Sequence, residues 1–167
     1  STKALAIEPE DVYTLSLRAR ALSNLGEHER AMKDCNKALE INPSSAYSHM
    51  ILGVLFQKLG EREKALTHLN TSIELESKYA HAYLWRCHVY MDMEQWDKAY
   101  QDCQAALQID PTSTHALDYR GSLHTRQGHY AEALSDYETL HERTPNHAGA
   151  CNDLAWFLAT VPDDRLR

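Results

Sequence analysis

A period of 34 residues runs through the whole chain and restricts the folds that it can adopt. Alanine holds one column of the period without exception, at Ala31, Ala65, Ala99 and Ala133. A second column contains only small residues, at Ala19, Gly53, Cys87, Gly121 and Ala155. A third contains proline or, once, serine, at Pro9, Pro43, Ser77, Pro111 and Pro145. Columns that agree on one period indicate stacked structural repeats, each of which packs on its neighbours.

Each period is predicted to form two helices. Leu15, Ala19 and Leu22 recur at helical spacing and mark the apolar face of a first helix. Gly26 ends that helix, because glycine readily takes the left-handed conformation of a helix end. Pro43 stops the second helix, since proline cannot continue the hydrogen-bond ladder. The expected first helices are 12–25, 46–59, 80–93, 114–127 and 148–160, and the expected second helices are 29–41, 63–75, 97–109 and 131–143. The expected N-caps are Asp11, Ser45, Ser113 and Asn146.

A 34-residue helix–turn–helix unit with small, aromatic and closing proline positions resembles the tetratricopeptide repeat. The third unit carries the pattern at Tyr83, Cys87, Tyr90, Ala99, Ala106 and Pro111. The second unit departs from it, with His49 at an aromatic position and Ser77 at the proline position. The resemblance implies an all-α, right-handed α-solenoid. The expected organisation is the end of a second helix of a truncated repeat (1–11), four repeats (12–45, 46–79, 80–113 and 114–147) and the first helix of a further or capping repeat (148–167).

Two charged columns change together along the chain. Arginine recurs in the first helices at Arg18, Arg86 and Arg120, and aspartate recurs 16 residues later at Asp34, Asp102 and Asp136. In the second unit both columns change, to Leu52 and His68. A charged pair that is lost as a pair predicts direct contact between the two helices of a unit, because buried arginines usually need a carboxylate partner. The alternative is that the arginines line a surface that binds anions.

The resemblance implies that the first helices form a concave wall that holds a protein or peptide, so the chain is expected to be a non-catalytic interaction scaffold. Aromatic residues and methionine are enriched where partner proteins bind. The residues expected to contact a partner are Tyr13, Arg20, Tyr47, Met50, Val54, Leu84, Trp85, His88, Tyr119 and Trp156. For Trp85 and Tyr119, packing between adjacent first helices explains the aromatic side chain equally well. The competing hypothesis is a structural or regulatory module of a multidomain enzyme, acting through its ends or its convex face.

One known ligand class of the family is not expected here. Tetratricopeptide domains that bind the acidic C-termini of chaperones use a clamp of lysine, asparagine and arginine side chains on three first helices. The corresponding positions of this chain hold Ser16, Arg20, Ile51, Leu84 and His88. None of the five is the family residue. We therefore expect no clamp for a chaperone C-terminal carboxylate.

Metal binding and catalysis are not expected either, and no cofactor is predicted. Although the chain has 10 histidines, only His81, His88 and His115 fall on neighbouring first helices in a way that two of them could share an ion, with Asp92 or Asp118 as a third ligand. A functional zinc site needs three or four ligands. No HExxH, glycine-rich phosphate loop or GxSxG sequence is present, so an enzyme is not indicated.

Composition further restricts the classes of binding partner and the compartment that we expect. A formal charge of -7 argues against nucleic acid, which is bound through a basic surface. The four cysteines form no CxxC pair and follow the apolar helical pattern, as expected for free thiols in the reducing cytoplasm. The longest apolar runs are too short to span a membrane.

The two ends of the chain read as incomplete repeats. Ala4 and Ile7 align with the end of a second helix, which predicts a fragment of a longer protein. At the other end, Leu154, Phe157 and Leu158 form an apolar face that no second helix follows. Solenoids normally finish with a polar capping element. Self-association through these apolar ends is therefore a possible means of covering them.

Overall fold

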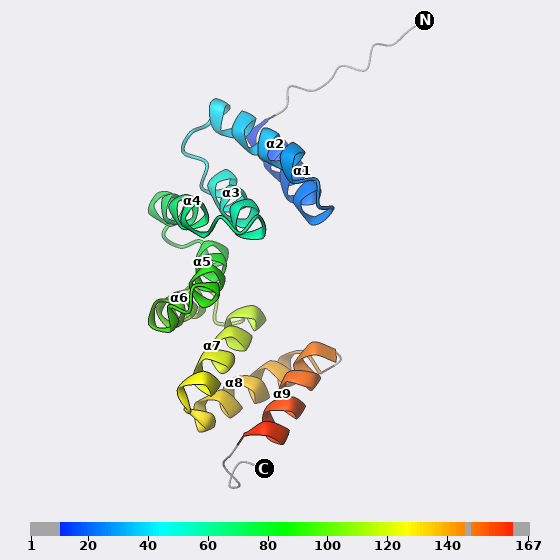
Figure 1. The fold of residues 1–167 in the computed structure, drawn as a ribbon, viewed down its shortest axis with the longest axis vertical. Helices are drawn as coiled ribbons and strands as arrows, with labels where there is room; N and C mark the ends of the chain where they lie inside the picture. The colour runs from blue at the N-terminus through cyan, green and yellow to red at the C-terminus, as the bar shows by residue number, and fades with distance from the viewer. Residues whose placement is uncertain (1–10, 146–147, 162–167) are drawn as a thin grey trace, which may run out of the picture. The chain divides into compact units, whose positions relative to one another are not determined.

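A computed structural model describes residues 11–145 and 148–161 of the chain, and over these residues the protein is helical with no strand (Figure 1). The first helices of the repeats are α1 (Val12–Asn24), α3 (Ala46–Lys58), α5 (Ala80–Asp92), α7 (Thr114–Gln127) and α9 (Ala148–Thr160). The second helices are α2 (His28–Ile41), α4 (Arg62–Leu75), α6 (Trp96–Ile109) and α8 (Tyr130–Arg143). The helix ranges expected from the sequence are confirmed to within one residue at each end.

The helices form two compact groups, an N-terminal group of α1 to α4 and a C-terminal group of α5 to α9. In the N-terminal group α1 packs on α2, α3 packs on α4, and α3 also contacts both α1 and α2. In the C-terminal group α5 packs on α6 and α7 packs on α8, while α6 contacts α7 and α8 contacts α9. Short turns join the two helices of each pair, which therefore lie antiparallel as hairpins (Figure 1).

Three of the first helices, α1, α3 and α7, begin at the N-caps that the sequence predicts. The Asp11 carboxylate accepts a hydrogen bond from the amide of Thr14 at 2.7 Å. Ser45 and Ser113 accept in the same way from amides three residues further along, at 3.2 and 3.4 Å. These bonds satisfy amides that have no partner within the helix. The fourth expected cap, Asn146, lies outside the described residues.

The turn between the two helices of a unit needs a left-handed residue. Gly26, Gly60 and Gly128 take φ angles of 80°, 77° and 77°. In the third unit the same place is held by Glu94, with φ 56°. A residue with a Cβ atom is disfavoured in this conformation by roughly 1–2 kcal/mol, so the turn geometry of the repeat persists there against the local preference.

The small-residue columns lie where the two helices of a unit touch. The four alanines of the second helices are completely buried: Ala31, Ala65, Ala99 and Ala133. On the facing first helix, a Cβ added at Gly53 would lie 2.6 Å from Cγ of Leu69 and 3.3 Å from the carbonyl oxygen of Ala65. Gly53 is therefore required for the close approach of α3 to α4.

The predicted arginine–aspartate contacts are confirmed in all three units that carry them. Each arginine donates two hydrogen bonds from its first helix to the carboxylate of the second helix: Arg18 to Asp34 at 2.6 and 2.8 Å, Arg86 to Asp102 at 2.8 and 2.6 Å, and Arg120 to Asp136 at 2.9 and 2.5 Å. The aspartates are buried. Pairing in this forked geometry compensates for the removal of the carboxylate from water.

A histidine pair takes the place of this contact in the second unit. Nδ1 of His68 lies 3.1 Å from Nδ1 of His49, and its ring stacks on Phe56 with the ring centroids 5.4 Å apart. Nε2 of His49 lies 3.1 Å from the carbonyl oxygen of Pro43. Burial lowers the pKa of His68, and the neighbouring His49 lowers it further. The folded protein therefore favours the neutral form of His68.

The apolar face that the sequence predicts on α9 is partly covered, with Leu154 and Leu158 half-buried. Phe157 is completely buried, and its ring centroid lies 5.3 Å from that of Tyr137 on α8. Val161 and Ala133 complete this cluster. The sequence predicted a face with no helix to cover it, but the second helix of the preceding repeat, α8, packs against part of this face. The pattern expected at residues 1–8 lies outside the described residues.

Within the described part of the chain, each helix is too short or too polar to cross a lipid bilayer.

Replacement of Gly53 by alanine is expected to destabilise the protein by about 1–2 kcal/mol, because Leu69 is buried and cannot move away freely. The clash outweighs the gain in helix propensity of about 1 kcal/mol. Gly121→Ala is the matched control, since the atoms nearest its Cβ would be ring atoms of Tyr137 at 3.0 and 3.1 Å and Cβ of Asp136 at 3.4 Å, all farther away than Cγ of Leu69 is from a Cβ at Gly53. We expect Gly121→Ala to remain within about 1 kcal/mol of the wild type in urea unfolding. Equal losses of stability in the two variants would show that the close approach of α3 to α4 does not determine the cost of the added methyl group.

The free energy of unfolding is expected to fall as the pH drops through the ordinary pKa of histidine. The pKa of His68 is lowered in the folded state, so the unfolded chain takes up a proton at this site before the folded chain does. Urea unfolding at about pH 8 and about pH 6 should therefore show a smaller loss of stability for His68→Asn than for the wild type. His141→Asn, at a half-buried position on α8, is the control and should keep the wild-type loss. An unchanged loss in His68→Asn would contradict this account.

Candidate interaction site

Three of the predicted partner-contacting residues form an aromatic cluster in the C-terminal group of helices, α5 to α9. Trp85 and His88 lie one turn apart on α5, with ring centroids 5.9 Å apart. The ring of Tyr119, on α7, lies 5.8 Å from that of His88. All three side chains are half-buried, so each keeps part of its surface open to solvent. We name Trp85, His88 and Tyr119 the aromatic cluster.

Acidic side chains accompany the aromatic cluster. Oδ1 of Asp92 lies 3.9 Å from Nε2 of His88, one turn further along α5. Burial raises the pKa of Tyr119 to about 12, and nearby groups including Asp118 and Asp92 contribute to the rise. The Tyr119 hydroxyl therefore stays protonated at neutral pH. Ring faces next to carboxylates attract cations, because both present negative potential.

His88 contributes a polar atom as well as a ring face. Its Nδ1 atom is buried and has no hydrogen-bond partner among the residues that the structure describes. Buried polar atoms are rarely left in this state, and each one calls for a physical explanation. A ligand group that reaches the aromatic cluster could pair with this nitrogen.

A smaller aromatic group lies in the N-terminal group of helices, α1 to α4. Tyr13 on α1 and Tyr47 on α3 have ring centroids 6.3 Å apart, and Tyr13 is 66% exposed. Burial raises the pKa of Tyr47, while the positive charge of Arg20 acts in the opposite direction. Tyr47 Oη is buried without a hydrogen-bond partner in the described part of the chain. The structure thus brings Tyr13, Arg20 and Tyr47 together as a second, separate group.

Three predicted partner-contacting residues are buried instead of open. Met50 and Val54 are 4% and 7% exposed, within a segment of α3 that is buried from Met50 to Leu55. A helix that is apolar on all sides is covered on all sides. Leu84 is 8% exposed and packs with Ala106 and Ala116. These three side chains therefore belong to the core and offer little surface to a ligand.

Trp156, the last of the predicted residues, is 62% exposed on α9. The neighbouring Asn152 is exposed too. An indole ring with this exposure remains available for contact with a partner.

Sequence reasoning placed Asp92 and Asp118 on the expected binding face and weighed them as third ligands of a metal ion. It did not include them among the expected partner contacts, although they flank the aromatic cluster. The available signal was their position: Asp92 follows Trp85 by two turns, and Asp118 immediately precedes Tyr119. Among the described residues, no three histidine, cysteine, aspartate or glutamate side chains converge as metal ligands would.

Comparison with family models matches the tetratricopeptide repeat to residues 12–45, 46–79 and 80–113. The chain belongs to the tetratricopeptide repeat family, and its fold is the all-α solenoid class of that family. The family is one of protein-interaction scaffolds that are generally non-catalytic. Comparison with curated protein sequences finds no significant match.

Solved structures with the same fold include three of particular relevance. PilF of Pseudomonas aeruginosa aligns with a TM-score of 0.83 at 23% identity, over 89% of this chain and 68% of its own. YrrB, described as a TPR protein with an unusual peptide-binding site, aligns with a TM-score of 0.72 at 24% identity, over 98% of this chain and 84% of its own. The first TPR domain of Spaghetti (RPAP3), bound to the HSP90 peptide SRMEEVD, aligns with a TM-score of 0.66 at 22% identity, over 71% of this chain and 94% of its own. At these identities the likeness concerns the fold.

Proposed function

We propose that this chain is a non-catalytic scaffold that binds an extended or helical segment of another protein on its first helices. The observation that carries the proposal is the aromatic cluster, whose three rings come from two first helices and remain partly open. Partly exposed aromatic side chains supply large contact areas at low entropic cost, and they dominate many binding sites. The peptide-binding site described for YrrB supports the same use of this fold.

The chemistry around the cluster favours a particular kind of ligand side chain. Asp92 is exposed, and Asp118 is half-buried next to Tyr119. A lysine or arginine of the partner would place its charge between these carboxylates and its aliphatic chain on the Trp85 ring. The proposed ligand is therefore a segment with at least one basic residue.

A chaperone C-terminal carboxylate is a poorer candidate for the ligand. Ser16, at one clamp position, is completely buried and forms a 2.7 Å hydrogen bond with Ser48. Ile51 and Leu84, at two others, are 2% and 8% exposed. These side chains provide packing between helices in place of charged contacts with a carboxylate. The absence of the clamp thus remains our prediction for this chain.

Selection of a random linear peptide library on the immobilised protein would test the proposal. We expect the enriched peptides to contain lysine or arginine, and Trp85→Ala to weaken the best of them by about 30-fold, which corresponds to ~2 kcal/mol. Trp96→Ala, on second helix α6 and also half-buried, is the matched control and should stay within about threefold of the wild type. Circular dichroism would verify that both variants keep their helices.

A second pair of variants isolates the acidic contribution. Asp92→Asn should weaken binding of the basic peptide, whereas Asp97→Asn, exposed on α6, should not. Binding that survives Trp85→Ala and Asp92→Asn but is lost in the second-helix controls would overturn the assignment of the first-helix surface.

A further inference from the structure

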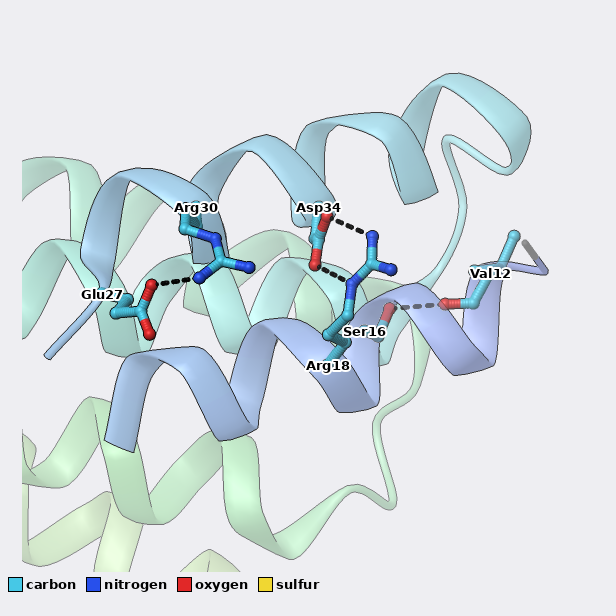
Figure 2. A network of polar contacts seen from close by, with 6 residues as sticks. All are labelled: Val12, Ser16, Arg18, Glu27, Arg30 and Asp34. Atoms are coloured by element: carbon cyan, nitrogen blue, oxygen red, sulfur yellow. Dashed lines mark hydrogen bonds and ion pairs between the residues drawn. The ribbon is translucent and has the colours of Figure 1, made fainter. Parts of the chain in front are cut away.

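A cleft between α1 and α2 of the first repeat is lined almost entirely by charged side chains. Its volume is about 410 Å³, and its lining residues are Arg18, Leu22, Arg30, Lys33, Asp34 and Lys37. Figure 2 shows Arg18 reaching from α1 to Asp34 of α2, with Arg30 one turn earlier on α2 beside Glu27. Four of the six lining side chains are cationic and one is anionic, in a chain whose formal charge is -7.

The arginine in this cleft is more open than its counterparts in the other repeats. The Arg18 side chain is 49% exposed, compared with 20% for Arg86 and 28% for Arg120. The Arg86 guanidinium lies over the rings of Tyr83 and Tyr90, 5.5 and 5.9 Å from their centroids.

Leucines replace these two tyrosines in the first repeat. Leu15 and Leu22 stand 68 residues before Tyr83 and Tyr90, at the equivalent places of the repeat. Leu15 is completely buried and Leu22 is 8% exposed, so neither side chain extends over the guanidinium as a tyrosine ring does. The greater exposure of Arg18 therefore accompanies the lack of a ring at Leu22, where the other two arginine-bearing repeats have Tyr90 and His124.

The two lysines of the cleft are also particular to this repeat. Lys33 and Lys37 are exposed one turn apart on α2. The equivalent residues of the other three units are uncharged: Thr67, Gln101 and Ser135 for Lys33, and Thr71, Ala105 and Thr139 for Lys37. The repeat itself therefore does not require a positive charge at either place.

A second hollow continues from the cleft along α2. It has a volume of about 540 Å³, shares Lys33 and Lys37 with the cleft, and adds Met32, Asn36, Glu29 and Glu40. Two adjoining hollows suit an elongated ligand better than a single inorganic ion. Glu29 and Glu40 disfavour an extended polyanionic surface, because a membrane or nucleic acid would bring many negative charges against them.

We propose that this basic cleft binds an acidic segment of a partner protein. Lys33 and Lys37 receive two carboxylates of the segment, and the exposed part of Arg18 contributes to the positive potential at the floor of the cleft. Residues four apart on a helix have Cβ atoms about 5–6 Å apart. This spacing matches acidic residues at i and i+2 of an extended segment, which point to the same side. None of these residues belongs to the aromatic cluster, so the two surfaces can be tested separately.

Fluorescence anisotropy with a labelled peptide of alternating glutamate and alanine tests the proposal. We expect the wild type to bind this peptide more weakly as salt is added, and Lys33→Glu with Lys37→Glu to weaken binding by at least about tenfold. The matched control is Lys64→Glu with Lys98→Glu, which changes the net charge equally at exposed places on α4 and α6. It should stay within about twofold of the wild type, because the cleft is unchanged.

Leu22→Tyr tests the geometry of the cleft without changing its charge. This variant restores the ring that Tyr90 provides in the third repeat, and it should weaken peptide binding by about three- to tenfold through occlusion of Arg18. Trp85→Ala should leave binding of the acidic peptide unchanged, which distinguishes this site from the proposed site on the aromatic cluster. Circular dichroism verifies the fold of each variant.

Four outcomes would overturn the proposal. Equal losses in both lysine pairs would assign the effect to net charge. Equal binding of a glutamine–alanine peptide would exclude recognition of carboxylates. Binding of inorganic phosphate or of vesicles containing an anionic lipid, without binding of the peptide, would assign the cleft to another ligand. No detectable peptide binding at low salt would show that the cleft does not serve this purpose.

Discussion

The close approach of two antiparallel helices within each repeat is the constraint on which the rest of the structure depends. Each of the second helices α2, α4, α6 and α8 carries an alanine that is completely buried. Gly53 shows how little room the facing first helix has. Contact at this distance allows no larger side chain, since overpacking displaces the helices. Because each repeat has the same contact, the turn geometry must also be the same. Glu94 adopts the left-handed turn conformation even though it is not glycine.

Polar contacts between the same helices show that the repeat accepts more than one solution to the same problem. Three units place a buried aspartate opposite an arginine, and the second unit places His68 opposite His49 and Phe56. Both arrangements satisfy buried polar atoms across the helix pair. They differ in charge, because the aspartate–arginine contact joins two charged groups whereas burial favours the neutral form of His68.

The two proposed binding surfaces have opposite electrostatic character. The aromatic cluster is accompanied by Asp92 and Asp118, whereas the cleft of the first repeat gathers Lys33 and Lys37 around Arg18. A formal charge of -7 describes neither surface, because net charge carries no information on where the charges lie. In both cases the distinctive residues are ones that the repeat leaves free to vary. The packing positions keep the fold, and the variable positions between them give each repeat its own surface.

The sequence by itself determined the repeat length, the helix boundaries, most of the caps and the arginine–aspartate contacts. All of these follow from local rules or from columns that change together, so they need no knowledge of distant packing. The exposure of individual side chains was decided only by the tertiary structure. Met50, Val54 and Leu84 occupy the predicted face but are buried, and Phe157 is covered by α8. Periodicity places a residue on a helix face, but neighbouring helices decide whether that face is open, and their packing depends on side chains far away in the sequence.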